Sequence, residues 1–186
     1  MRVITEVTGE TQGLVPVEVL DGIPGALGPV AEEVFRRGWR TLKLYFMLGL
    51  PGETDEDIEA IIDLAHRVRR LGLDIGGRKT EVHVSVSTFV PKPHTTFQWS
   101  PLADRDTVER RQSLLRERLR GRGLRLSWNQ YDSTRLESLL ARGDRRLNAV
   151  IEAAWRHGAR FDAWDEWRSL EAWERAFAET GFDVDS

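Results

Sequence analysis

The sequence contains no cysteine, and this absence removes several kinds of chemistry from the chain. None of its 186 residues can form a disulfide, a thiolate zinc site or a cysteine ligand to an iron–sulfur cluster. The four histidines, His66, His83, His94 and His157, include no pair at the spacing of metal ligands. We therefore predict no metal site built from the chain's own residues.

Long apolar runs and a strong net charge are missing as well. No window approaches the roughly 18 apolar residues of a membrane span, and the first residues hold no apolar stretch of signal-peptide length. The formal net charge is only −3, which gives no overall attraction to nucleic acid or to an anionic membrane. We expect a cytoplasmic protein without a membrane partner, and we do not expect it to bind nucleic acid.

Lysine is scarce, with 3 Lys beside 24 Arg, and many of the arginines fall in one stretch. These are Arg105, Arg110, Arg111, Arg116, Arg118, Arg120, Arg122 and Arg125. Acidic residues are interleaved with the arginines between residues 104 and 117, and no aromatic residue lies among them to stack on a base. We interpret the stretch as a solvated helix face, with RNA binding as the alternative.

Two alternating segments predict the centre of the fold. Residues 42–48 and 82–86 alternate between apolar and other side chains, which indicates two strands, and residues 55–71 between them show helical spacing. A helix-length connection favours parallel pairing through a right-handed crossover. The two strands then end at the same edge, so the loops that start at Gly49 and Phe89 share one mouth.

The side chains of these strands separate into two faces. If the leucines, the phenylalanine and the valines face the helices, the residues between them line the opposite side. That side then holds Lys43, Tyr45, Met47, His83, Ser85 and Ser87. A polar row of this kind suits a lumen that holds a ligand, as in α/β barrels and open α/β sheets.

The five residues Gly49, Leu50, Pro51, Gly52 and Glu53 form a candidate ligand loop. The glycines allow backbone to approach a flat ligand without interference from a Cβ atom, and Pro51 stiffens the turn. Glu53 could accept hydrogen bonds from a ribose or an amine. A strand-to-helix turn also uses glycine and an acidic residue for structural reasons alone, and this second interpretation stays open.

Capping residues and glycines predict where the helices begin and end. Thr54 is the expected N-cap of the helix that follows the loop, and Gly72 is its expected end. Asp104 or Asp106 is expected to open the arginine-rich helix.

The two ends of the chain have different patterns. Residues 1–28 are the hardest to interpret, although residues 3–7 could form a strand. Residues 129–186 show only helical spacing and predict an appendage that packs against the strand-containing part. Several of the seven tryptophans cluster there, namely Trp155, Trp164, Trp167 and Trp173. We expect them to pack in a core, with a platform for a nucleobase as the alternative.

Residues 44–54, followed by an acidic helix and then by residues 87–99, closely resemble the second half of radical S-adenosylmethionine enzymes. The segments are Leu-Tyr-Phe-Met-Leu-Gly-Leu-Pro-Gly-Glu-Thr and Ser-Thr-Phe-Val-Pro-Lys-Pro-His-Thr-Thr-Phe-Gln-Trp. Residues 140–147 and 158–164 are similar to the tail of the branch that carries a cobalamin-binding domain. The resemblance extends from about Ala31 to Gly181.

This resemblance implies a partial (βα)6 barrel over residues 1–128, with residues 1–28 poorly matched, and a helical extension over residues 129–186. The loop from Gly49 to Glu53 would pack near the adenine of S-adenosylmethionine. Cobalamin is a possible cofactor within the family. The partner would be an N-terminal half-barrel or a second copy of the chain, and no catalytic residue is assigned.

The chain departs from the family at its cluster-binding motif. Members bind a [4Fe–4S] cluster through three cysteines spaced CxxxCxxC, and this chain has none, so it cannot hold the cluster or generate the radical alone. We expect a truncated member, a separately encoded C-terminal half or the product of a displaced start site. The alternative is a non-catalytic module of the same fold that binds a nucleotide or a partner protein.

Overall fold

The computed structural model describes residues 4–7, 15–17, 27–160 and 169–182. The elements are β1 (Ile4–Val7), β2 (Val15–Val17), α1 (Leu27–Arg36), β3 (Thr41–Leu48), α2 (Asp55–Gly76), η1 (Gly77–Lys79), β4 (Glu81–Thr88), α3 (Arg105–Arg118), β5 (Leu124–Trp128), α4 (Tyr131–Arg142), α5 (Leu147–Arg156) and α6 (Leu170–Thr180). The chain forms two units. One consists of Met1–Phe89 and Pro101–Tyr131, and the other of Val90–Ser100 and Asp132–Ser186.

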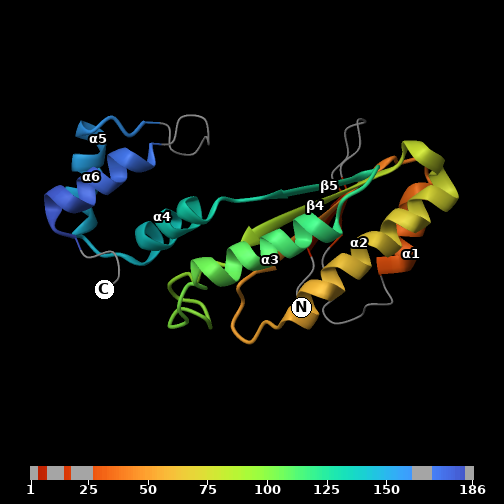
Figure 1. Cartoon of the computed structure of the whole chain (residues 1–186), viewed down its shortest axis with the longest axis horizontal. Coiled ribbons are helices and arrows are strands. Elements are labelled where there is room, and N and C mark those ends of the chain that lie inside the picture. The colour runs from red at the N-terminus through yellow and green to blue at the C-terminus, as the bar shows by residue number, and fades with distance from the viewer. Residues whose placement is uncertain (1–3, 8–14, 18–26, 161–168, 183–186) are drawn as a thin grey trace. The chain divides into compact units, whose positions relative to one another are not determined.

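A mixed five-stranded sheet organises the first unit (Figure 1). The strand order is β2-β1-β3-β4-β5, with β3, β4 and β5 parallel and with β1 antiparallel to both of its neighbours. The register of the central pair runs from Thr41 opposite Glu81 to Leu48 opposite Thr88. The mixed α/β class and the parallel pairing of the two predicted strands are therefore confirmed, in an open sheet with three parallel strands.

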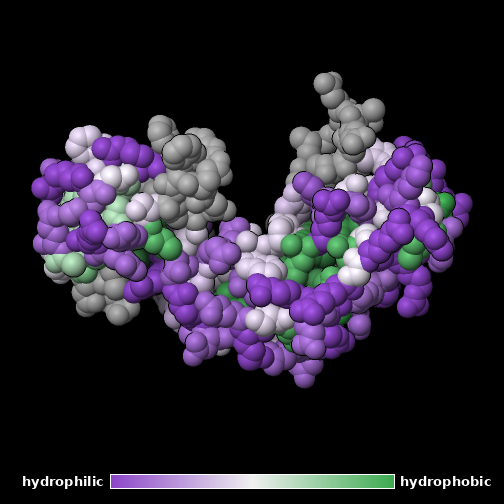
Figure 2. All heavy atoms as spheres, turned by 45° about the horizontal axis from the view of Figure 1, so that its top comes forward, coloured by the Kyte–Doolittle hydropathy of each residue, from purple (hydrophilic) through white to green (hydrophobic). Residues whose placement is uncertain are grey.

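One face of the sheet carries the core of this unit. The alternate residues of β3 and β4 are buried, and they pack with apolar side chains of α1, α2 and α3. Burial of one such side chain is worth about 1.5–3 kcal/mol, so this face is the main source of the unit's stability. The other face carries the partly exposed residues of the same strands, as the alternation predicts. Figure 2 shows a group of hydrophobic side chains that reaches the surface in the part of the molecule that holds the sheet.

The limits of α2 are predicted correctly at its start and wrongly at its end. Thr54 is the N-cap, and its N–H donates to Asp57 Oδ2 at 3.0 Å. The helix does not stop at Gly72 but continues to Gly76. Gly72 is buried, and a Cβ atom there would lie only 3.0 Å from the ring of Phe35. Gly72 thus serves close packing, and the helix ends before Gly77, whose φ of +73° suits glycine.

Strand β1 covers the edge of β3, with Thr5 opposite Leu44. The segment that is hardest to interpret from the sequence thus contributes a central strand. The other residues before Leu27, namely 1–3, 8–14 and 18–26, lie outside the described part of the chain.

The helices α5 and α6 form the core of the second unit (Figure 1). Trp173 is buried there, with its ring 6.2 Å from that of Phe177. Trp155 differs from the expectation of core packing, because it is 58% exposed and carries the guanidinium of Arg160 over its ring. Residues 161–168, which include the other two tail tryptophans, lie outside the described residues.

Candidate ligand site at the carboxyl edge of the parallel strands

The two predicted loops leave the sheet side by side. Strands β3 and β4 end at the paired residues Leu48 and Thr88, and the N–H of Phe89 donates to the carbonyl of Leu48 at 2.7 Å. Ligands of open α/β sheets bind outside this carboxyl edge. The start of each loop therefore lies where the parallel arrangement predicts it.

The loop from Gly49 to Glu53 is a tight turn with two left-handed residues. Gly49 and Gly52 have φ of +82° and +81°, and the N–H of Glu53 donates to the carbonyl of Leu50 at 3.0 Å. Pro51 and Gly52 are exposed, whereas Gly49 is buried. A Cβ atom on Gly49 would lie 2.7 Å from the Cβ atom of Ala103, so only glycine fits there.

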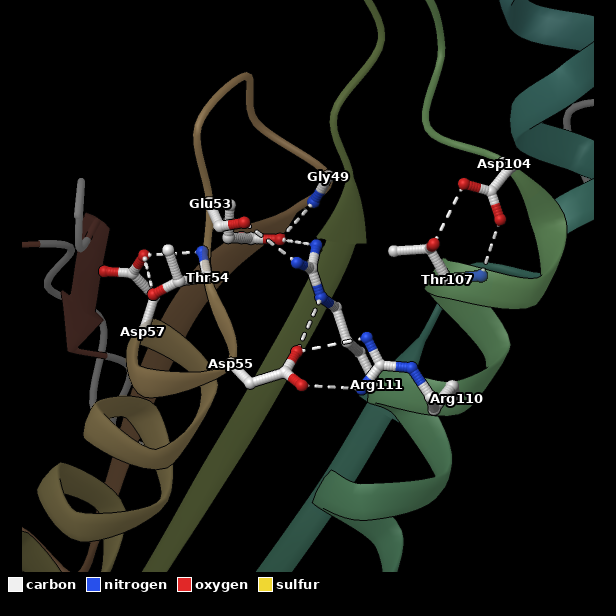
Figure 3. A network of polar contacts seen from close by, with 9 residues as sticks. All are labelled: Gly49, Glu53, Thr54, Asp55, Asp57, Asp104, Thr107, Arg110 and Arg111. Carbon is white, nitrogen blue, oxygen red and sulfur yellow. Dashed lines mark hydrogen bonds and ion pairs between the residues drawn. The ribbon is translucent and has the colours of Figure 1, made fainter.

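The side chain of Glu53 points into the unit (Figure 3). Its Oε2 accepts a hydrogen bond from the N–H of Gly49 at 2.7 Å and forms an ion pair with Arg111 Nη1. The other terminal nitrogen of Arg111, Nη2, donates to the main-chain carbonyl of Glu53 at 3.0 Å. The two side chains are only 6% and 8% exposed, so the arginine of α3 holds the loop through a buried pair.

Burial has the largest effect on the ionisation of Glu53. It raises the pKa of this carboxyl above its usual value, while the N–H of Gly49 and the charge of Arg111 oppose the rise. Desolvation can exceed the attraction between buried charges, and removal of one partner then leaves an uncompensated charge. Loss of one partner from such a pair typically costs about 3–5 kcal/mol.

Two buried side-chain atoms near the loop have no hydrogen-bond partner within the described ranges: Thr88 Oγ1 and Arg111 Nε. The nearest carboxylate oxygen to that nitrogen, Asp55 Oδ1, is 3.7 Å away and thus too far for a hydrogen bond. Asp55 instead accepts two hydrogen bonds from exposed Arg110, at 2.9 and 3.1 Å. Buried unpaired polar atoms are rare in proteins, and both of these flank one loop.

The six residues predicted for the lumen lie together on the face of the sheet opposite the helical core. They form three cross-strand pairs, Lys43 with His83, Tyr45 with Ser85 and Met47 with Ser87. All six are partly exposed. The pairs that lie nearer the loop edge carry no formal charge.

The charged groups of this face lie at its other end. Glu81 binds His83 Nε2 at 3.1 Å and Arg125 Nε at 3.0 Å. These two partners hold the pKa of the Glu81 carboxyl below its usual value. The face is thus polar and ion-paired far from the loop, and uncharged beside it.

The second loop continues into the other unit after Phe89. His94 has a φ of +62°, and its N–H donates to Gln98 Oε1 at 3.3 Å. Trp99 is 87% exposed. The described contacts give these residues no chemical role.

Sequence reasoning misses Arg111. The interpretation of the arginine stretch as a solvated helix face holds for the four exposed members within α3 and is wrong for Arg111, which is buried. The remaining three arginines are exposed as well, but they lie beyond the end of α3, one of them in β5. A helical pattern contains a signal for this difference, because Val108, Arg111 and Leu115 recur at spacings of three and four residues. The partner, Glu53, is 58 residues away in the chain and cannot be inferred from that pattern.

Metal-binding groups and membrane-spanning helices are absent from the part of the chain that the structure describes. No three His, Cys, Asp or Glu side chains of the described residues lie close enough together to hold a metal ion. None of the described helices is both long and apolar enough to cross a membrane.

Comparison with known proteins gives one relative of unknown role. Over 116 residues, which are 62% of this chain, the sequence is 33% identical to the uncharacterized protein MJ0966 of Methanocaldococcus jannaschii. The matched region spans 24% of that protein's length, about a quarter. No family model matches the chain, and no solved structure matches it either.

Proposed function

We propose that this chain is the C-terminal portion of a radical S-adenosylmethionine enzyme, and that it contributes the adenine-side loop and part of the substrate lumen. The loop from Gly49 to Glu53 would hold the adenosyl group. The cross-strand pairs Tyr45 with Ser85 and Met47 with Ser87 would line the lumen beside it. A partial (βα)6 barrel would extend the observed open sheet.

The observation that carries the proposal is the coincidence of three features at one edge. Parallel strands end together, a turn with two left-handed glycines leaves one of them, and an uncharged face opens beside that turn. The purine base of a nucleoside is flat and edged with hydrogen-bonding groups. Small-molecule sites are typically of this mixed kind, with few polar groups and a backbone that can come close.

S-adenosylmethionine and the [4Fe–4S] cluster fit the chain differently. Gly52 is exposed, and a Cβ atom there would meet no atom within 4 Å, so the turn leaves room for S-adenosylmethionine at its surface. When bound, that molecule would supply its adenosyl group for contact with the loop. The [4Fe–4S] cluster does not fit, because the sequence provides no thiolate, and we derive no step from it.

Calorimetric titration of the purified chain with S-adenosylhomocysteine tests the proposal. We expect weak binding that Ser85→Phe abolishes, since a phenyl ring would fill the lumen beside the loop. Ser113→Phe is the matched control, because it places the same ring on an exposed position of α3. No binding by the unaltered chain, or equal effects of the two substitutions, would contradict the proposed site.

A non-catalytic module that binds a nucleotide or a partner protein is the second candidate, and β1 favours it. In a barrel completed by an N-terminal half, a further parallel strand would pair with the free edge of β3, and antiparallel β1 pairs with that edge here. The two candidate functions predict different affinities of the isolated chain for the ligand. Tight binding by the isolated chain supports the module, whereas weak binding without iron absorbance is the result expected of an incomplete enzyme.

A further inference from the structure

We infer that Arg111 is the positioning residue of this loop and that it keeps the carboxylate of Glu53 away from the ligand. The loop then presents main-chain groups of Leu50, Pro51 and Gly52 to whatever binds there. The identity of the ligand rests on the proposed function. The positioning role rests on contacts within the first unit alone.

The contacts of Arg111 fix both ends of the turn at once. One terminal nitrogen binds Glu53 Oε2, and the same oxygen accepts the N–H of Gly49, so a single carboxylate joins the first and last residues of the loop. The other terminal nitrogen binds the main-chain carbonyl of Glu53. The planar guanidinium makes the two contacts from separate nitrogens in a fixed geometry, whereas a lysine ammonium has a single nitrogen on a flexible stem and does not reproduce that geometry.

The base of the loop is held on a second side. Gly49 lies against Ala103, and the hydroxyl of Tyr131 donates to the carbonyl of Ala103 at 2.9 Å. Asp104, the next residue, is the N-cap of the helix that carries Arg111 and accepts the N–H of Thr107 at 2.8 Å. Ala103, just before α3, therefore supports the loop by packing at Gly49. Arg111 within α3 supports it through the ion pair with Glu53 (Figure 3).

Glu53 is poorly placed to meet a ligand directly. Its side chain is 6% exposed, whereas Pro51 and Gly52 are exposed at the tip of the turn. A ligand that approaches the tip meets backbone, and the left-handed φ of Gly52 leaves that backbone without a covering side chain. The acidic residue of the loop thus acts inside the protein, as the acceptor that Arg111 and Gly49 share.

The test compares Arg111→Met with Arg110→Met, a matched control one residue earlier on the same helix whose ion pair with Asp55 is exposed. Two readouts need no ligand: amide hydrogen exchange at Gly49 and the pH titration of the Glu53 carboxyl carbon by NMR. In Arg111→Met we expect exchange at Gly49 to be about tenfold faster. We also expect the Glu53 titration to move to higher pH, because the opposing positive charge is gone. Arg110→Met should change neither.

A second pair of variants separates positioning from folding and from direct contact. Arg111→Lys keeps the charge but loses the fork, so Gly49 should still exchange faster while amides in the middle of α2, which lies in the same unit, keep their protection. For S-adenosylhomocysteine we expect an affinity loss of about tenfold in Arg111→Met, with no further loss when Glu53→Gln is added, because the two residues act as a unit.

Three results have distinct meanings. Unchanged Gly49 exchange and unchanged Glu53 titration in Arg111→Met would overturn the positioning role. An additional loss of affinity from Glu53→Gln in the Arg111→Met background would overturn it too, since Glu53 would then touch the ligand itself. If the unaltered chain binds no S-adenosylhomocysteine, the proposed function fails, while exchange and titration still decide the role of Arg111.

Discussion

Gly49 shows how one residue sets the geometry of the loop. Its φ of +82° is strained for any residue with a Cβ atom, and the space beside it is already filled by Ala103. Gly52 has nearly the same φ, but nothing lies within 4 Å of the position of its Cβ atom. A comparison of substitutions at the two glycines therefore distinguishes the effect of conformational strain from that of steric overlap.

We expect Gly49→Ala to destabilise the chain more than Gly52→Ala. The strain of a left-handed alanine costs about 1 kcal/mol at either position, and overlap with Ala103 adds about 1–3 kcal/mol at Gly49 only. Urea denaturation of both variants measures the difference. Equal losses of unfolding free energy would show that the close approach of Gly49 to Ala103 does not constrain the loop.

Arg111 also shows what the sequence conveys at this scale and what it does not. A turn is predicted by the two glycines, Pro51 and Glu53. The alternation of the strands places the lumen residues on one face. The sequence does not convey that Glu53 faces inward, because its direction depends on an arginine from another helix. A contact across 58 residues has no local pattern.

At the scale of elements, the N-cap of α3 lies beside the loop, because Asp104 follows Ala103, which packs against Gly49. Asp104 accepts hydrogen bonds from the N–H and the hydroxyl of Thr107, both at 2.8 Å. These bonds hold the pKa of the Asp104 carboxyl below its usual value, with the N–H of Thr107 as the largest cause. A capping carboxylate also suits the positive end of the helix.

The cap predicts a pH dependence of α3. Because the folded-state pKa of Asp104 is lowered, its contribution to stability is complete above the unfolded value near 3.8 and is lost as pH falls through the folded value. Asp104→Asn should still cap the helix but remove this dependence. Exchange of the first amides of α3 between pH 2 and pH 6 measures it, and an identical pH profile in both proteins would contradict the assignment.

The order of the strands was only partly predictable. Alternation over residues 42–48 and 82–86 indicates two strands and their faces, because each strand is half buried and the period is strict. The helix-length connection between them indicates their parallel direction. Strand β1 was uncertain, since four residues among glycine-rich neighbours carry little pattern. Its place beside β3 depends on pairing across some forty residues of sequence, which no local signal specifies.

At the scale of the molecule, β1 occupies the edge of β3, and we expect it to keep that edge from pairing with another chain. An unpaired strand edge exposes a row of N–H and C=O groups that can pair with another chain. We expect Thr5→Pro, which removes a backbone donor from this central strand, to free the edge of β3 and to cause concentration-dependent association. Thr5→Val keeps the strand and is the control.

Sedimentation velocity at several concentrations measures that effect. A monomer at every concentration for Thr5→Pro would show that β1 is not needed to cover the edge. Association of the unaltered chain as well would support the expectation of a second copy, with pairing through one of the remaining edge strands, β2 or β5.

The residues of the proposed site lie in the first unit. The loop from Gly49 to Glu53 and the uncharged end of the sheet lie in the same unit, whereas residues 90–100 belong to the other. The chain matches about a quarter of the length of a longer archaeal protein. The ligand site that we propose consists of the loop and the sheet face of the first unit.

Chemical-shift mapping of the full chain with S-adenosylhomocysteine tests this claim most directly. We predict that the shifted amides are those of Leu50, Gly52, Tyr45, Met47 and Ser85, which lie in the turn and at the uncharged, partly exposed end of the sheet face. Shifts confined to α5 and α6 or to the helical side of the sheet, or no shifts at millimolar ligand, would contradict it.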